Sequence, residues 1–370
     1  MKTVDLAELS DRHGAFYAPT FAVRIDGRDL VRELALAVTQ VEIDLSLGAA
    51  GRFSFTVADA YSLQKRSFLD GYGRAALDTL RFGAGVEVAL GYGDHSRLPL
   101  LLSGMVTEVT TGFAEGGSPE LAVSGYDHAF PMTLGKRSQS WTQAADSDAV
   151  HALARDHNLG TDVETTREKH AQIEQNQESD FEFLKKLAER NHFEFYVDSR
   201  KRLRFGPPRD DGDGICSIGW GAGLLSFKPE ANLAAQVSEV RVYGWDKQRK
   251  QPIVGRARAG EETGKEPRRD SGGAQVRRAT GRDAVLELRQ PVFSEAEARR
   301  RAQAVLNDHA KRFLTGEAEC LGLPDLLPDR NVTLTNLGAP FSKTYYVQQT
   351  VHKVDGSGYR TRFKVKETSL

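Results

Sequence analysis

Histidine and cysteine are the residues of this sequence whose spacing would reveal a metal site. His151 and His157 lie six positions apart on one expected helix, too far round its axis to share a metal ion. Cys216 and Cys320 are the two cysteines, and neither has a second cysteine or a histidine at zinc-ligand spacing. His352 lies in an expected strand, where a hydrogen-bonded histidine is the ordinary case. The sequence therefore predicts no metal site, no cofactor and no disulfide, and two buried thiols in a reducing cytoplasm.

Serine and glycine motifs give no sign of catalysis either. Ser103-Gly104 and Ser124-Gly125 lack the glycine two residues earlier that a hydrolase nucleophile elbow requires. Asp211-Gly212-Asp213-Gly214 resembles the start of a calcium loop but lacks the later glutamate, so we interpret it as a turn. The glycine pairs at 83–85 and 91–93 precede expected strands, whereas a dinucleotide loop precedes a helix. We predict no catalytic residue, and hence no enzyme.

The charge pattern excludes a general attraction to nucleic acid or to an anionic membrane. Lys and Arg total 50 against 51 acidic residues in 370, a net charge of −1. The arginine clusters 268–269, 277–278 and 299–301 have acidic neighbours and no aromatic stacking partners, which favours solvated helix and linker faces. The N-terminus lacks the basic and apolar segments of a signal peptide, and no run approaches the ~20 apolar residues of a membrane helix. We therefore expect synthesis in a bacterial cytoplasm, without a signal peptide and without direct membrane contact.

From residue 19 to residue 127 the sequence alternates like a half-buried antiparallel sheet. Apolar residues recur at every second position in 21–25, 41–45 and 53–57, and turns such as Asp26-Gly27 separate these runs. The alternation continues through 86–90, 100–109 and 121–124. These runs predict a first β-barrel domain over residues 15–135.

Residues 136–208 have helical periodicity and predict a small α/β domain. One helix is expected over 146–157, where Val150, Leu153 and Ala154 share a face. A second helix is expected after Ser179, because Ser179 and Glu182 have the spacing of a capping box. Its end is expected at Asn191, in the left-handed conformation, followed by strands over 193–197 and 202–205.

The rest of the chain is expected to return to β structure around a charged interruption. Strands expected over 224–227, 235–243, 331–334, 344–354 and 359–366 predict a second β-barrel domain from residues 209–247 with 314–370. Residues 248–293 are expected to be a flexible charged excursion, because the composition of 248–282 buries little apolar surface. A helix over 294–313, with Glu295 and Glu297 in its first turn, is expected to pack on the second barrel.

The two β regions share a pattern that suggests an internal repeat. Residues 82–91 and 102–109 resemble residues 327–336 and 346–354, and a Gly-Tyr pair follows each set, at Gly125-Tyr126 and Gly358-Tyr359. Val106 and Val109 match the spacing of Val351 and Val354. The sequence therefore predicts two similar barrels.

Two stretches carry a resemblance to a known family. Residues 175–188, with Gln175, Glu178, Ser179 and Asp180 followed by Phe-Leu and Leu-Ala pairs, resemble the signature of the phage late-control protein D family. That family includes phage tail hub proteins and the hub portion of the type VI secretion valine-glycine-repeat protein G. Residues 322–328 and the strands after them resemble the family's final barrel, so that the resemblance spans roughly residues 15–368. Asn191-His192 replace the family's usual glycine, which puts the shape of that loop in doubt.

The resemblance implies a structural baseplate hub of a contractile injection system or phage tail. Its expected fold is β-rich α+β, with two similar antiparallel tube-type barrels and an inserted α/β domain, in a homotrimer with a pseudo-sixfold ring. Such a ring would adapt the sixfold inner tube to a threefold central spike, here a separate protein, with baseplate wedge or LysM-type proteins as further partners. The particle would be released by lysis or act from the cytoplasm.

Two alternatives remain open from the sequence. One is a secreted effector or adhesin built on a hub-like scaffold, which would need additional chain for its cargo. The other is a cell-wall hydrolase, for which the sequence has no motif.

Overall fold

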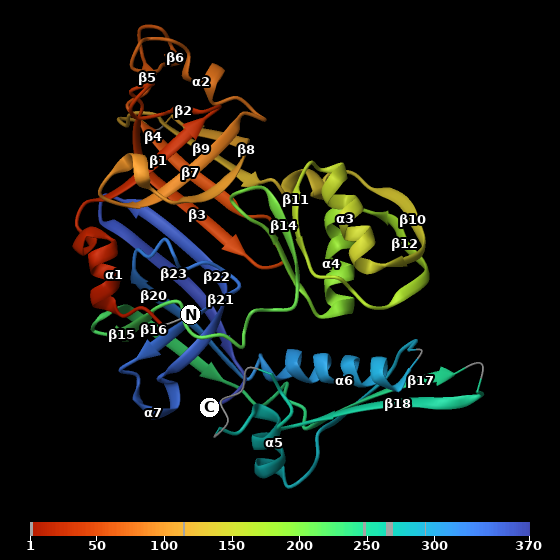
Figure 1. Cartoon of the computed structure of the whole chain (residues 1–370). Helices are drawn as coiled ribbons and strands as arrows, with labels where there is room; N and C mark the ends of the chain where they lie inside the picture. Colours follow the sequence, from red (N-terminus) through yellow and green to blue (C-terminus); the bar gives the residue numbers. More distant parts are fainter. Residues whose placement is uncertain (1–2, 114, 247–248, 264–268, 293) are drawn as a thin grey trace.

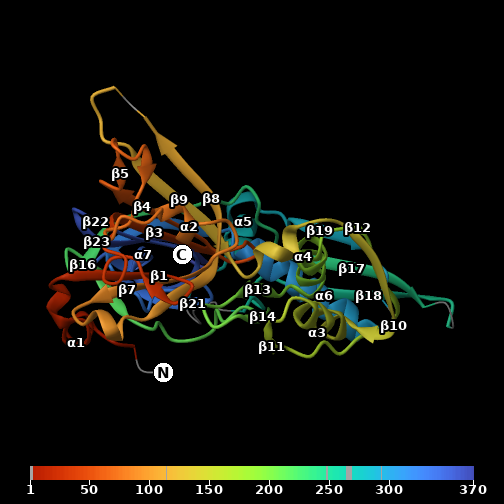
Figure 2. The same cartoon turned by 90° about the horizontal axis from the view of Figure 1, so that it is seen from above.

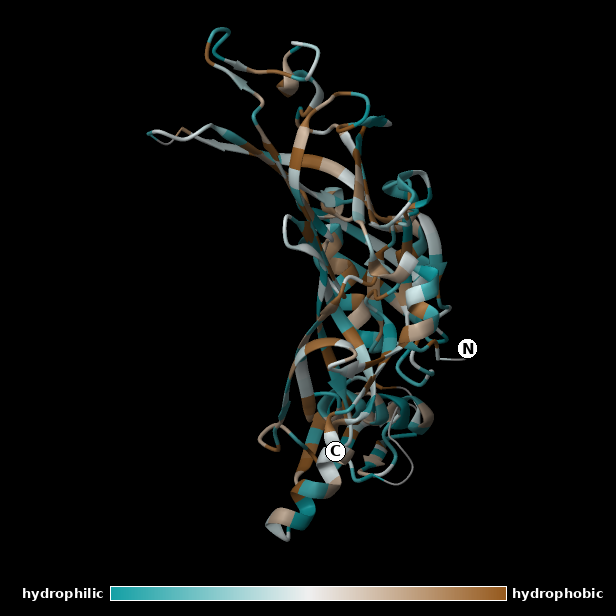
Figure 3. Cartoon of the chain, turned by 90° about the vertical axis from the view of Figure 1, so that its left-hand side faces the viewer, coloured by the Kyte–Doolittle hydropathy of each residue, from teal (hydrophilic) through white to brown (hydrophobic). Residues whose placement is uncertain are grey.

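Thirteen strands form one continuous sheet that runs through two β units (Figure 1). The structure is a computed structural model that describes residues 3–113, 115–246, 249–263, 269–292 and 294–370. The first β unit consists of β1 (Pro19–Ile25), β2 (Arg28–Asp29), β3 (Ala37–Ser46), β4 (Arg52–Ala58), β7 (Gly85–Tyr92), β8 (Leu100–Gly112) and β9 (Glu120–Asp127). The second β unit consists of β15 (Ser217–Trp220), β16 (Gly223–Ala231), β20 (Leu314–Leu321), β21 (Arg330–Thr335), β22 (Lys343–Asp355) and β23 (Gly358–Glu367). Hydrophobic and hydrophilic residues alternate along the long strands, as Figure 3 shows.

Five strands of each unit follow the same antiparallel order. The order β3-β4-β9-β8-β7 in the first unit corresponds to β16-β20-β23-β22-β21 in the second. Two irregularities also correspond: an extra residue at Thr39 matches one at Leu225, and an extra residue at Thr107 matches one at Gln348. Bulges shift every later side chain by one position, so their coincidence fixes which residues of the two units are equivalent.

The two units differ in how their sheets close. In the second unit, pairing runs β22-β21-β15-β16-β20-β23 and returns to β22. In the first unit, β1 and β3 do not pair with each other within the described part of the chain; β3 pairs instead with β22. Moreover, β1 is antiparallel to β7, whereas β15 is parallel to β21. The two units are therefore similar in strand order, but only the second is closed by its own pairing.

The expected equivalence of the two Gly-Tyr pairs is wrong. Gly125-Tyr126 lie near the end of β9, whereas Gly358-Tyr359 begin β23. The bulges likewise make Val106 equivalent to Val347, and not to Val351 as the sequence pattern suggested. Short alternating strands resemble one another locally, so a sequence match of this kind can slip along the strand.

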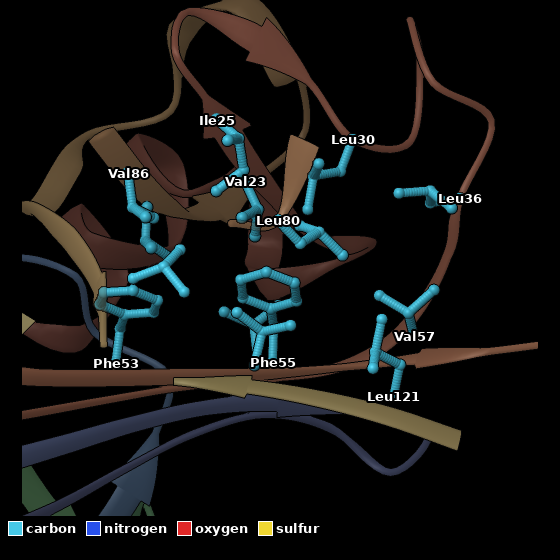
Figure 4. Packing of buried hydrophobic residues seen from close by; sticks show 14 of the residues in the cluster. Val23, Ile25, Leu30, Leu36, Phe53, Phe55, Val57, Leu80, Val86 and Leu121 are labelled. Carbon is cyan, nitrogen blue, oxygen red and sulfur yellow. The ribbon is translucent and has the colours of Figure 1, made fainter. Parts of the chain in front are cut away.

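The core of the first β unit lies between its sheet and a cap of small elements. Phe53 and Phe55 stack with ring centroids 6.3 Å apart, Val23 and Leu80 lie near Phe55, and Leu121 lies beside Val57 in the same cluster (Figure 4). The cap contains β5 (Tyr61–Ser62), β6 (Ser67–Phe68) and α2 (Ala76–Thr79). Between β9 and the next domain lies a short 3-10 turn (Phe130–Thr133), and another (His95–Arg97) joins β7 to β8.

The predicted α/β domain is present, with a core of its own. It consists of β10 (Arg137–Ala145), α3 (Asp146–Asp156), β11 (Gly160–Val163), β12 (Lys169–Glu178), α4 (Asp180–Asn191), β13 (Glu194–Val197) and β14 (Arg202–Gly206). The capping box at Ser179 and Glu182 is confirmed. The left-handed residue that ends α4 is His192, with φ 55°, and not Asn191, whose amide instead donates to Asp146 and to the Leu187 carbonyl.

Residues 248–293 differ from the expected flexible excursion. Where the structure describes them they include β18 (Gln251–Arg258), α5 (Gly272–Thr280) and β19 (Val285–Arg289), and β17 (Glu239–Asp246) pairs with both strands. The strand β17 was expected in the second barrel but belongs to this separate three-stranded sheet, and the helix α6 (Glu295–Ala310) packs on β17 and β18. A Cβ on Gly255 would lie 2.1 Å from the backbone of Ala298, so small residues bring helix and strand together. Small residues bury little area each, which is why the hydrophobic signal of this region is weak.

The first residues of the chain cover the second β unit. The helix α1 (Leu6–Arg12) buries Leu9 in the second core, a 3-10 turn (Gly14–Phe16) follows it, and Val4 bridges Cys216. A short helix α7 (Gly338–Phe341) joins β21 to β22. Among the described residues, no helix is long and apolar enough to cross a membrane.

Candidate assembly surface

One face of the continuous sheet is polar across both β units. A row of directly opposed residues crosses six strands from β4 to β16, namely Arg52, Asp44, Val351, Arg362, Glu319 and Ser226. Residues on the opposite face of β3 and β4, such as Ile43 and Phe53, belong to the first core. Because side chains alternate between the two faces of a sheet, one face holds the core while the other meets solvent.

Several charged and polar side chains of this face contact one another. The Gln349 amide donates to Asp44 over 2.8 Å, across the joint between the two units. Arg360 and Glu319 are 2.8 Å apart, and Lys364 and Glu317 are 3.5 Å apart. Exposed pairs of this kind contribute little to stability, and they leave no concentrated positive charge to hold nucleic acid. The face is suited to line a hydrated space.

Buried polar groups fix the two units to each other. The Tyr92 hydroxyl donates to the Gly322 carbonyl over 3.0 Å, and its ring lies 5.5 Å from that of Tyr359. One ring nitrogen of His352, Nδ1, lies 2.9 Å from the Tyr359 hydroxyl, and the other, Nε2, lies 3.0 Å from the Leu326 carbonyl. Burial lowers the pKa of His352 to about 4, so the imidazole is neutral at physiological pH. His352 is thus hydrogen-bonded, as the sequence suggested, and the structure places it in the interior.

A glycine is required in this joint. A Cβ on Gly322 would lie 2.0 Å from the ring of Tyr359. Thr361 accepts from the Leu323 amide over 2.9 Å, which holds the segment after Gly322 against β23. The stretch 322–328, which resembles part of the family's final barrel, therefore contributes to the contact between the units.

The stretch 175–188 that resembles the family signature contains Asp180, the centre of a hydrogen-bonded cluster in the α/β domain that is called the latch below. Asp180 accepts from Gln175 over 2.8 Å and from Arg137 over 2.6 Å, and it lies 2.7 Å from His157. Burial alone would raise the pKa of this carboxyl, but the hydrogen bonds from Gln175, His157 and Arg137 hold it below its usual value. The latch ties β10, α3 and β12 to the first turn of α4.

A cavity of about 590 Å³ lies where the two β units and the α/β domain meet. Arg202, Arg204, Arg209 and Arg330 line it together with Asp162 and others. Arg204 is only 8% exposed, and a Cβ on Gly206 would lie 2.6 Å from its guanidinium, so the flat group rests on the glycine. The junction of the three parts is therefore charged rather than apolar.

The cysteines and histidines considered as metal ligands do not form a site. Cys216 and Cys320 are free and buried in the second core, and burial raises the pKa of the Cys216 thiol to about 12. His157 contacts Asp180 in the latch, and His151 is half-buried on the same helix. Among the described residues, no group of three or more His, Cys, Asp or Glu side chains could hold a metal ion.

The serines and the acidic turn have structural contacts. Ser103 donates to the Ser199 carbonyl over 2.8 Å, and Ser124 donates to Glu108 over 2.7 Å. The segment 211–214 lies in the connection between β14 and β15, as expected for a turn.

The arginine clusters are ion-paired. Arg277 lies 3.2 Å from Asp283, Arg301 lies 3.0 Å from Glu297, and Arg300 pairs with Glu168 of the α/β domain. Arg268 lies outside the described residues. These pairs fit the interpretation of the clusters as solvated helix and linker faces.

A comparison with families of known sequences matches almost the whole chain. The model described as the Alg8 N-terminal domain matches residues 18–356. The chain belongs to this family. The description names a domain and no reaction, and no curated protein matches the chain.

Solved structures share the fold over nearly the full length. The 43 kDa tail protein of prophage MuSo2 from Shewanella oneidensis is 14% identical with a TM-score of 0.69, covering 95% of this chain and 98% of that one. A tail protein from Neisseria meningitidis is 14% identical with a TM-score of 0.67, covering 95% and 97%. An Escherichia coli component of the type VI secretion system, described as similar to the T4 bacteriophage tail proteins gp27 and gp5, is 11% identical with a TM-score of 0.52, covering 94% and 77%. The expected tail-type β fold is thereby confirmed.

Proposed function

We propose that this chain is a structural baseplate hub of a phage tail or contractile injection system, of the late-control protein D type. Three copies would form a ring in which each copy supplies two tube-type barrels, giving six similar positions. One side of the ring would receive the sixfold inner tube and the other a threefold central spike. Baseplate wedge or LysM-type proteins would contact its periphery, and the chain would have no catalytic role.

The observation that carries this proposal is the continuous sheet with two units of the same strand order. Five strands and two bulges correspond between the units, and the units are joined edge to edge through β3 and β22. A chain with two equivalent units can present a sixfold arrangement with only three copies. The self-neutralised polar face on this sheet supports a hydrated channel, and the shared fold with tail proteins supports the setting.

Cryo-electron microscopy of particles isolated through a tag on this chain tests the proposal. We expect three copies between the tube and the spike, with the row from Arg52 to Ser226 facing the channel. Tagged protein that stays free of tubes, in cells shown to be producing such particles, would contradict the hub assignment.

Cysteine labelling gives a second, residue-level test. Because Cys216 and Cys320 are buried, Ser226→Cys would add one accessible thiol on the polar face, and Ser357→Cys one in the exposed β22–β23 turn. In isolated chains both should react with a bulky polyethylene-glycol maleimide. In particles, we expect the thiol at position 226 to be protected at least about tenfold from that reagent while remaining open to a small maleimide. Equal reactivity in the isolated chain and in the particle would argue against a channel-lining face.

A further inference from the structure

The bulge in β22 divides one edge of that strand between two partners. Before Gln348 the edge pairs with β21, over Lys343–Val347, and after it the edge pairs with β3, over Gln349–Val354. The Leu47 amide donates to the Gln348 carbonyl over 3.1 Å. This bond fixes which opposed residues of β3 and β22 are hydrogen-bonded pairs and which are not. This second part is the joint between the units.

The equivalent edge of β8 has only its first partner. Before Thr107 it pairs with β7, and after it, over 108–112, β8 pairs only with β9 within the described residues. Side chains there are mostly exposed, and the β8–β9 hairpin projects from the body of the molecule (Figure 2). Phe113 is 64% exposed at the position equivalent to Val354, which is buried in the core of the neighbouring unit. The first unit therefore presents the same edge that the second unit uses to join the first.

The strand equivalent to β3 also has an open edge. That strand is β16, which pairs with β15 only at Gly223 and Leu224 and otherwise only with β20, as far as the structure describes the chain. Residues 227–231 of β16 are equivalent to residues 41–45 of β3, the residues that pair with β22. One chain thus has two open edges, on β8 of the first unit and on β16 of the second, and they are equivalent to the two strands that pair in the joint between the units.

We propose that β8 of one copy pairs with β16 of a second copy in the way that β22 pairs with β3. The register follows from the joint within the chain: Val351 opposite Asp44 becomes Thr110 opposite Glu230 of the second copy. Phe113 would then lie opposite Phe227, as Val354 lies opposite Val41. The contact is head-to-tail, so it can continue from copy to copy and close a ring. This inference rests on the proposed function only for the number of copies in the ring.

Pro229 makes the joint between copies weaker than the joint within the chain. It occupies the position of Ile43, whose backbone faces β22, so the missing N–H of the proline lies on the open edge. A proline on an edge strand is a common protection against unwanted pairing. The joint within the chain keeps all its backbone donors, whereas the joint between copies has one fewer. Free chains are thereby discouraged from pairing until a template holds them together.

Disulfide trapping tests the register. Thr110 and Glu230 would form a non-hydrogen-bonded pair, whose close Cβ atoms suit a disulfide. We expect the double variant Thr110→Cys with Glu230→Cys to form reducible dimers and trimers on oxidation of isolated particles. The matched variant Thr110→Cys with Lys228→Cys, two residues out of register on the same face, should give about fivefold less product, because diagonal neighbours are ~7–8 Å apart. Each single variant should give no trimer.

The outcomes separate the pairing from the hub assignment. Particles that contain three copies by cryo-electron microscopy but show no cross-link between positions 110 and 230 would overturn the pairing and leave the hub function standing. Cross-linked trimers of purified, concentrated chain in the predicted register, from a host in which no tube contains the chain, would support the pairing and overturn the hub function. Equal product from the in-register and out-of-register variants would also overturn the pairing. Circular dichroism of each variant before oxidation checks that the chain is folded.

Discussion

The two β units have the same strand order, yet one edge that is covered in the second unit is open in the first. In β22 the edge beyond the bulge receives β3 along 349–354, whereas the same edge of β8 receives no strand within the described chain. The difference lies in chemistry as well as in pairing. Residues at the covered edge are buried, such as Thr350 and His352, whereas those at the open edge are exposed, such as Thr111. In a repeated fold, one edge can therefore pair within the chain while the equivalent edge of the other unit stays open for another molecule.

The largest expected effect comes from breaking the covered edge. Thr350→Pro removes a backbone donor that faces Leu45 of β3 in the middle of the sheet, and we expect a loss of about 3 kcal/mol or more. Val109→Pro, at the equivalent position of the open edge, should cost about 1 kcal/mol or less, because that edge has no strand to lose. Urea unfolding of both variants, followed by circular dichroism, measures the difference. Equal losses would show that the two edges are not distinct in the free chain.

The second effect is a pH dependence that only the covered edge should have. Burial lowers the pKa of His352 to about 4, below its usual value of 6.5. The neutral imidazole therefore makes its full contribution to the free energy of unfolding above pH 6.5, and this contribution is lost as pH falls toward 4. The stability advantage of wild type over His352→Gln should thus fall by roughly 3 kcal/mol between pH 7 and pH 4. Denaturant midpoints at several pH values measure it. Thr111→Gln, the matched variant, should show no such slope, and a slope of similar size there would refute the assignment.

The third prediction makes the open edge of β16 more similar to the paired edge of β3. Pro229→Val restores the N–H on β16, and one further hydrogen bond of about 1 kcal/mol should strengthen association of purified chains roughly fivefold. Sedimentation velocity over a concentration series measures this. Pro252→Val, on an edge strand of a separate sheet, is the control. An equal gain in that control would indicate general edge adhesion instead of a defined joint.

The smallest effect concerns the polar face. Gln349→Ala removes the hydrogen bond to Asp44 across the joint and should cost about 0.5–1 kcal/mol. Glu108→Ala, at the equivalent position, removes an exposed ion pair with Arg52 and a part-buried hydrogen bond from Ser124, so its cost should not exceed that of Gln349→Ala. Thermal unfolding of the pair compares them. A larger loss for Glu108→Ala would mean that this face matters more to the single chain than to an assembly.

The sequence predicted the elements whose signals are local. The capping box at Ser179 fixes the start of α4, and the alternation in 41–45 and 53–57 identifies β3 and β4 with their buried faces. These patterns depend only on neighbouring residues. The strand that contains His352 was predicted for the same reason, and the structure places His352 at a buried position of it.

The sequence could not predict the contacts that depend on distant residues. Asp44 and Val351 are paired across the joint although more than three hundred positions separate them. Neither strand has a local sequence pattern that identifies the strand with which it pairs. The packing of α6 on β18 depends on Gly255 and on alanines, whose small size gives little hydrophobic pattern. The open edges of β8 and β16 can be recognised only after the equivalence of the two units is known from their bulges.

The placement of α1 has a consequence for the order in which the protein can be completed. Leu9 is buried in a core whose other members, such as Ile218 and Leu334, are made far later. At roughly 5–20 residues per second of synthesis, this helix waits on the order of ten seconds or more for the strands that cover it. The first β unit and the α/β domain are available to fold during that wait. The helix α1 can therefore dock only after the strands of the second β unit have been synthesised.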